Sequence, residues 1–269
     1  MRILLTNDDG YDAPGLRALC AAVRTLPGAT MDVIAPAVAQ SGKGHTFSGR
    51  FRFWRATTGV MGEVLVVDGS PPDCVRAAVG LPGRQRPDWV ISGINRGSNL
   101  GVDIYNSGTV AAAREAGILG MPAIAISYLV KHEIPDDWDR ASREAAGIIA
   151  ALLQPAVPCP AGADEEVFRQ ALAALSTRRA GLDLPSPADR PHTWWNVNLP
   201  RLPAGQPHQG VRLTTISRDA MALDYRVQCD PDGVECCENL ASYHSRPFSP
   251  DTDVAATFSG HISISPLTW

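Results

Sequence analysis

Two adjacent carboxylates, Asp8 and Asp9, follow the short apolar run at residues 3–5 and precede Gly10. Neighbouring carboxylates raise each other's pKa unless a cation compensates their charge. The pair therefore favours a site for a hard divalent metal at the end of a buried strand. An Asp-Gly turn with solvated acids is the alternative interpretation. A dinucleotide-binding turn would carry glycines here to admit a pyrophosphate, so two negative charges disfavour that class.

Two later loops offer neutral oxygen atoms that a divalent cation could also use. Ser41 opens the segment SGKGH at residues 41–45, and Asn95 lies in the loop SGINRGSNLG at residues 92–101. An amide oxygen such as that of Asn95 suits a hard cation that carboxylates already bind. The Ser41 loop could hold a metal or an anion, or it could be a flexible connection in which Lys43 and His45 are solvated.

A fourth segment, after the acid pair and the two loops, has the residue types of an anion site. Ser107, Gly108 and Thr109 lead into VAAAREA at residues 110–116, a strongly helix-forming run. The start of a helix offers free N–H groups and the positive end of the helix dipole, which suits a phosphate. An ordinary N-cap is the alternative. Metal-type oxygens from three strand ends and an anion site from a fourth segment point to one combined site.

The elements that would position these residues are short apolar strands that alternate with helices. The expected strands are residues 3–5, 31–35, 64–67, 89–91 and 123–126, and the expected helices are residues 14–23, 73–79 and 109–117. This alternation predicts a three-layer α/β fold with a doubly wound, Rossmann-like, mostly parallel sheet. In such sheets ligands bind outside the carboxyl ends of the strands, where these loops would meet.

The second half of the chain reads differently. Helices are expected at residues 137–153 and 165–175, and strands at residues 194–199, 211–216 and 257–265. We expect these late strands to form a smaller, antiparallel, C-terminal β-rich region. The predicted organisation is a catalytic core at residues 1–155, a Pro- and Ala-rich excursion at 156–191, and a C-terminal segment at 192–269 that completes the fold and mediates oligomerisation.

Composition limits the classes of partner. The 269 residues are 45% hydrophobic with a net charge of −4, so we expect a globular protein that binds neither nucleic acid duplexes nor membranes. No apolar window approaches the ~20 residues of a membrane-spanning helix. The apolar start is too short for a signal peptide. The six cysteines show no disulfide-dense spacing, which favours a reducing cytoplasm and buried or incidental thiols.

Five motifs follow one another along the first half of the chain: TNDDG at residues 6–10, SGxG at 41–44, DGSPPDC at 68–74, SGINRGSNLG at 92–101 and SGTVAAARE at 107–115. In this order they closely resemble the SurE family of metal-dependent phosphatases. The resemblance resumes with NVNLP at 196–200 and near the C-terminus at 252–267. Two residues depart from the family pattern: Val102 stands where an acidic residue is common, and Asn106 stands where a Tyr is common. These departures leave the substrate preference open.

The resemblance implies a phosphomonoesterase, of the 5'-nucleotidase or acid phosphatase type, that hydrolyses nucleoside 5'- and 3'-monophosphates. It implies a divalent metal, Mg or Mn, held by four residues, and a phosphate site made by Ser107, Gly108 and Thr109 with Asn95. The implied metal ligands are Asp8, Asp9, Ser41 and Asn95, with Asp8 and Asp9 as the catalytic residues. It also implies a homodimer or homotetramer that exchanges C-terminal segments, since the late strands need a surface to bury them.

Two other functions are compatible with parts of the pattern. A phospho-receiver signalling module also has an acid pair after its first strand, with a phosphoacceptor where Asp68 ends the third. It needs a Lys after its last pocket strand, and residues 123–128 contain none. A noncatalytic nucleotide-binding protein would bind nucleotides without releasing phosphate.

Overall fold

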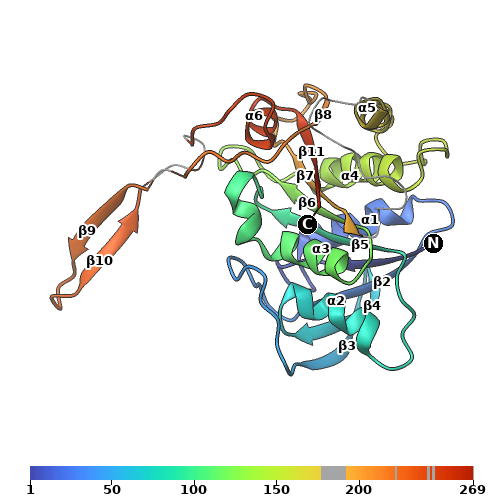
Figure 1. Cartoon of the computed structure of the whole chain (residues 1–269), viewed down its shortest axis with the longest axis horizontal. Coiled ribbons are helices and arrows are strands. Elements are labelled where there is room, and N and C mark those ends of the chain that lie inside the picture. The colour runs from blue at the N-terminus through green and yellow to red at the C-terminus, as the bar shows by residue number, and fades with distance from the viewer. Residues whose placement is uncertain (177–191, 222, 241–242, 244–245, 269) are drawn as a thin grey trace.

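A nine-stranded, mostly parallel sheet forms the centre of the computed structural model, in the order β3-β4-β2-β1-β5-β6-β7-β11-β8 (Figure 1). The structure describes residues 1–176, 192–221, 223–240, 243 and 246–268. The strands of this sheet are β1 Arg2–Thr6, β2 Thr30–Pro36, β3 Arg52–Thr58, β4 Gly62–Asp68, β5 Trp89–Arg96, β6 Ala123–Tyr128, β7 Trp194–Leu199, β8 Val211–Leu213 and β11 Ile262–Leu267. The fold is therefore α/β, as the sequence predicts.

Helices cover both faces of the sheet, which gives three layers. The helices are α1 Pro14–Arg24, α2 Pro71–Gly80, α3 Gly108–Ile118, α4 Trp138–Leu153, α5 Glu165–Ser176, α6 Asp253–Phe258 and the short 3-10 helix η1 Gly101–Tyr105. Side chains of α1, α4 and α5 share one apolar core with the sheet, and side chains of α2 and α3 share a second core. Two cores around a central sheet are the signature of a doubly wound fold.

The central strands are buried on both faces, which explains their continuous apolar runs. Leu5 of β1 pairs with Val33 of β2 on one side and with Ile91 of β5 on the other, and both pairings are parallel. Because these strands run in one direction, the loops after β1, β2 and β5 leave the same edge of the sheet. Asp8, Asp9 and Ser41 lie on the loops after β1 and β2, and the predicted phosphate turn lies at the adjacent start of α3. Asn95, predicted to lie in a loop, lies instead near the end of β5, which extends to Arg96.

The late strands differ from their prediction. Strand β7 pairs in parallel with β6 and antiparallel with β11, and β8 pairs in parallel with β11, so all three extend the main sheet. The predicted strand at 257–265 is wrong at its start, because α6 occupies residues up to Phe258 and the strand begins at Ile262. The antiparallel edge strand β3 was not predicted, because its residues are exposed and mostly polar rather than apolar.

A separate small antiparallel sheet lies near the C-terminus. It consists of β9 Tyr225–Cys229 and β10 Glu235–Asn239, and Figure 1 shows this hairpin projecting away from the body of the protein. Every residue of both strands is exposed. These two strands thus have no buried face, whereas the strands β7 and β11, which were predicted to need a partner, lie within the chain's own sheet.

Three further expectations concern the chain as a whole. Within the described ranges no helix is long and apolar enough to cross a membrane. All six cysteines are free thiols; Cys20 and Cys74 are buried, but the three on the hairpin are exposed, so the expectation of buried thiols holds only in part. Helix α5 lies inside the predicted excursion, and residues 177–191 of that excursion lie outside the described residues.

Candidate functional site

Asp8 is a buried carboxylate at the carboxyl end of the central strand β1. Its side chain meets the start of α3, where Thr109 Oγ1 donates a hydrogen bond to Asp8 Oδ1 at 2.5 Å. Gly108 packs directly on the carboxylate, since a Cβ there would lie 2.8 Å from Asp8 Cβ and 3.1 Å from Asp8 Oδ2. A glycine is required at this position because any side chain would displace Asp8. The predicted acid and the predicted phosphate turn are therefore in contact.

The surroundings of Asp8 favour its neutral form in the metal-free protein. The pKa of this carboxyl is raised from 3.8 to about 6, mainly by burial and to a lesser extent by the nearby negative charge of Asp9. The hydrogen bond from the Thr109 hydroxyl opposes this effect in part. A bound cation would compensate the charge that burial now disfavours.

Asp9 and Asn95 come together through the residue that follows Asn95. The backbone N–H of Arg96 donates to Asp9 Oδ2 at 3.2 Å. Burial raises the pKa of the Asp9 carboxyl, and the N–H and positive charge of Arg96 offset part of the rise. The Asn95 amide nitrogen donates to the Gly97 carbonyl at 2.6 Å, which leaves the side-chain oxygen as the atom suited to a cation.

Ser41 lies on a loop that contacts both Asp8 and the phosphate turn. The N–H of Gln40 donates to the Asp8 carbonyl at 2.7 Å, and the N–H of Gly44 donates to the Asn106 carbonyl at 3.0 Å. Ser41 itself is exposed between these two anchors. The structure thus brings the backbone near Ser41 to the site, whereas the side chain faces solvent.

The same loop is held at its far end by a buried acid that the sequence analysis did not single out. Glu115 of α3 accepts from Arg76 at 2.6 Å and contacts His45 Nε2 at 2.7 Å. Burial alone would raise the pKa of Glu115, but the hydrogen bonds from His45 and Arg76 outweigh it and hold the pKa below its usual value. His45 is therefore an anchored side chain rather than a solvated one, and the loop that carries Ser41 is fixed at several points.

Ser107 is the N-cap of α3. Its hydroxyl oxygen accepts from the Val110 N–H at 3.0 Å, so the alternative interpretation as a helix cap is correct for this side chain. The hydroxyl hydrogen is still available to a ligand, because a hydroxyl can accept and donate at once. Ser107 can therefore cap the helix and also serve the predicted anion site. The Thr109 hydroxyl, by contrast, donates its hydrogen bond to Asp8.

A buried asparagine network fixes the loop that follows Asn95. Asn99 receives a hydrogen bond from Asn196 Nδ2 at 2.8 Å, and its own N–H donates to Asn198 Oδ1 at 2.9 Å. The Asn99 amide also donates to Ser127 Oγ at 2.7 Å. These residues come from β6, β7 and the loop after β5, so only the assembled sheet brings them together. The motif NVNLP was the one sequence signal that could have found them.

The predicted metal ligands offer only oxygen atoms, two from carboxylates and two from neutral groups. This set suits a hard divalent cation such as Mg or Mn, and the crowded Asp8 and Asp9 carboxylates fit such an ion. Within the described part of the chain no group of three or more His, Cys, Asp or Glu side chains could hold a metal. A cation at this site would therefore depend on neutral ligands such as Asn95 and Ser41.

Comparison with known sequences gives matches along almost the whole chain. The family model described as Survival protein SurE matches residues 3–222. A putative 5'-nucleotidase of Synechocystis sp. is 35% identical over 267 residues, which cover 99% of each protein. A 5'-nucleotidase SurE of Symbiobacterium thermophilum is 35% identical, with 98% of this chain and 91% of that protein covered. A 5'/3'-nucleotidase SurE of Yersinia pseudotuberculosis is 34% identical, with 99% and 89% covered.

The fold gives the same result. The crystal structure of a SurE protein from Aquifex aeolicus superposes with a TM-score of 0.73 at 28% sequence identity, covering 100% of this chain and 93% of that one. The family-model match over most of the chain, together with relatives 34–35% identical along nearly their full length, shows that this protein belongs to the SurE family.

Proposed function

We propose that this protein is a divalent-metal-dependent phosphomonoesterase that hydrolyses nucleoside 5'-monophosphates, and also 3'-monophosphates, to nucleoside and phosphate. The observation that carries the proposal is the contact of a buried carboxylate, Asp8, with the glycine and threonine that open α3. A carboxylate that suits a metal thus lies beside a helix start that suits an anion, which supports the proposal. The names of the relatives, 5'-nucleotidase and 5'/3'-nucleotidase, support the choice of substrate.

The proposed metal ligands are Asp8, Asp9, Ser41 and Asn95. A bound Mg or Mn ion would polarise a phosphoryl oxygen and lower the pKa of an attacking water. Ser107 and the N–H groups of the first turn of α3 would bind the phosphoryl oxygens and stabilise their charge. Thr109 holds Asp8 in place through its hydroxyl. Either a water molecule or Asp8 itself could attack phosphorus, and in the second case an acyl phosphate forms.

We also propose a homodimer or homotetramer, in the cytoplasm, that assembles through the β9–β10 hairpin. An isolated two-stranded hairpin is marginally stable in water. Tyr225, Val227 and Val234 are 55%, 61% and 57% exposed on it, so the hairpin gains stability if a second copy covers these side chains.

The first prediction tests the activity. Purified protein should release phosphate from nucleoside monophosphates with Mg or Mn, and a chelator should abolish release. Asp8→Asn should lower kcat by roughly 100-fold or more, since a charged metal ligand is lost. Asp12→Asn, an exposed acid of the same loop that pairs with Arg17, serves as the matched control and should keep activity. Undiminished turnover of wild type in chelator would contradict the metal assignment.

The second prediction concerns stability in the absence of metal. Because burial raises the pKa of Asp8 from 3.8 to about 6, ionisation costs the folded state up to about 3 kcal/mol above pH 6 and nothing below pH 4. In chelator, Asp8→Asn should therefore unfold at a higher temperature than wild type at pH 7.5 and at the same temperature near pH 4. Thermal unfolding of both proteins, with Asp12→Asn beside them, provides the measurement. An equal difference at both pH values would refute the charged-state cost.

The third prediction separates phosphate binding from helix capping. Ser107→Ala should lower kcat/KM, because a hydrogen bond to a charged group is lost. The decrease should correspond to a loss of roughly 1 to 3 kcal/mol of transition-state binding free energy. Asp164→Ala removes an equivalent cap, since Asp164 Oδ1 accepts from the Val167 N–H at 3.0 Å at the start of α5. Asp164→Ala should lower the melting temperature about as much as Ser107→Ala does, but it should leave kcat/KM unchanged. Gly108→Val should abolish the binding of inorganic phosphate, measured by calorimetric titration, and intact phosphate binding in this variant would end the phosphate-site proposal.

The fourth prediction concerns assembly. The ends of the hairpin are adjacent, because the Leu240 N–H donates to the Asp224 carbonyl at 2.6 Å. Residues 225–239 can therefore be replaced by Gly-Gly. This variant should sediment as a monomer, and its melting temperature should change only through the loss of the partner. An oligomer that survives the deletion, or a monomeric wild type at micromolar concentration, would show that the hairpin has no such role.

A further inference from the structure

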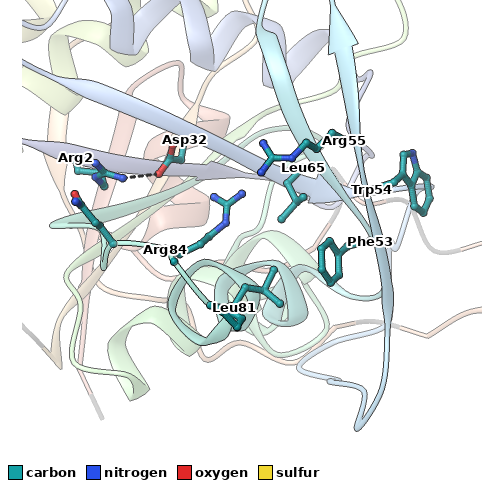
Figure 2. A pocket seen from close by; sticks show the side chains of 11 residues that line it. Arg2, Asp32, Phe53, Trp54, Arg55, Leu65, Leu81 and Arg84 are labelled. Atoms are coloured by element: carbon teal, nitrogen blue, oxygen red, sulfur yellow. Dashed lines mark hydrogen bonds and ion pairs between the residues drawn. The ribbon is translucent and has the colours of Figure 1, made fainter.

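A cavity lined by described residues lies at the opposite end of the sheet from Asp8. It has a volume of about 500 Å³, within the range of small-molecule sites. Its walls come from the start of β1, from β2, β3 and β4, and from the loop after α2 (Figure 2). Arg2 lines the cavity and Asp8 follows it six residue steps later, along extended strand and turn, so about 20 Å lie between the two places. A ligand bound in this cavity would be distinct from one bound at the phosphate turn.

The cavity is rich in positive charge although the protein has a net charge of −4. Arg2, Arg55 and Arg84 line it, against a single carboxylate, Asp32. Asp32 is already paired with Arg2 at 3.2 Å, and Arg55 pairs with Glu63 on the exposed surface of the β3–β4 ladder. Arg84 has no ion pair or side-chain hydrogen bond with any residue that the structure describes. One guanidinium is therefore free to bind an anion.

The sequence Leu-Pro-Gly-Arg at residues 81–84 directs Arg84 into the cavity. These four residues form a turn in which the Arg84 N–H donates to the Leu81 carbonyl at 3.3 Å. A turn with Pro at its second position can require a positive φ at the third, and Gly83 there has a φ of +79°. Figure 2 shows the guanidinium groups of Arg84 and Arg55 pointing toward one another across the cavity. Arg55 is paired with Glu63 through one nitrogen only, so its remaining N–H groups can bind an anion together with Arg84.

The wall beside the guanidinium groups is apolar. Phe53 stands two residues before Arg55 on the edge strand β3, so both side chains leave the same face of the sheet. Figure 2 shows the Phe53 ring turned into the cavity opposite Leu81. The ring is 49% exposed, so a flat ligand can stack on it.

We propose that this cavity is a second ligand site, for a small organic anion that carries a planar ring. Arg84 and Arg55 bind the anionic group, for which the planar, forked guanidinium is well suited. Phe53 and Leu81 contact the ring. The assignment stands on the cavity alone and does not depend on the proposed catalytic activity.

Calorimetric titration with AMP as the probe, in chelator so that no turnover occurs, tests this site. The protein carries Gly108→Val to disable the phosphate turn; if that variant does not fold, Ser107→Ala is used, and only the AMP binding that Arg84→Gln removes is assigned to this cavity. AMP should bind, and adenosine or phosphate alone should bind at least about tenfold more weakly, because each lacks one half of the ligand. Adding Arg84→Gln should weaken AMP binding at least about tenfold.

The control is Arg86→Gln, on the same loop but outside the cavity, which should leave AMP binding unchanged. Phe53→Ala should abolish the advantage of AMP over phosphate. The proposal is overturned if AMP does not bind under these conditions, or if Arg84→Gln and Arg86→Gln behave alike. Phosphate release by Arg84→Gln with metal present is measured in parallel and should equal that of wild type, so that failure of this site is distinguishable from failure of the proposed activity.

Discussion

The candidate site depends on one energetically unfavourable feature, the burial of the Asp8 carboxylate at the end of the central strand β1. Burial raises the pKa of this group to about 6, and Asp9 beside it adds repulsion. The fold tolerates the arrangement because the Thr109 hydroxyl donates to Asp8 and because the missing side chain of Gly108 leaves space for the carboxylate. The start of α3 and the acid pair are therefore one structural unit, in which the proposed metal site and the proposed anion site adjoin.

Buried polar contacts hold the surrounding loops in place where apolar packing is not available. Glu115 ties the Ser41 loop to the side of α3 through His45, while Asn99 ties the loop after β5 to the ends of β6 and β7. A loop fixed in this way loses little entropy when a ligand binds, since it is already ordered. Each contact also couples the site to an element distant in sequence, so the late strand β7 contributes to the site without supplying a predicted ligand.

The fold class and the location of the site could be predicted from the sequence because both rest on local patterns. Continuous apolar runs such as residues 123–126 need burial on both faces, and alternation with helices then leaves a parallel sheet as the arrangement. The loops after parallel strands must meet at one edge, which brings Asp8, Asn95 and the Ser41 loop together. The start of the helix at Ser107 could also be predicted from the sequence, because an N-cap depends on only a few consecutive residues.

Pairings between distant residues were decided by the tertiary structure. The sequence predicts strands at 194–199 and 257–265, but it does not predict that β7 joins β6 in parallel, since both a separate sheet and an extended one bury such strands. The exposed hairpin and the edge strand β3 escaped prediction because they lack the apolar pattern that burial produces. The contact of Thr109 with Asp8, the anchoring of His45 by Glu115 and the convergence of Arg55 with Arg84 depend on the packing of elements far apart in the chain, and residue type alone carries no information about such distances.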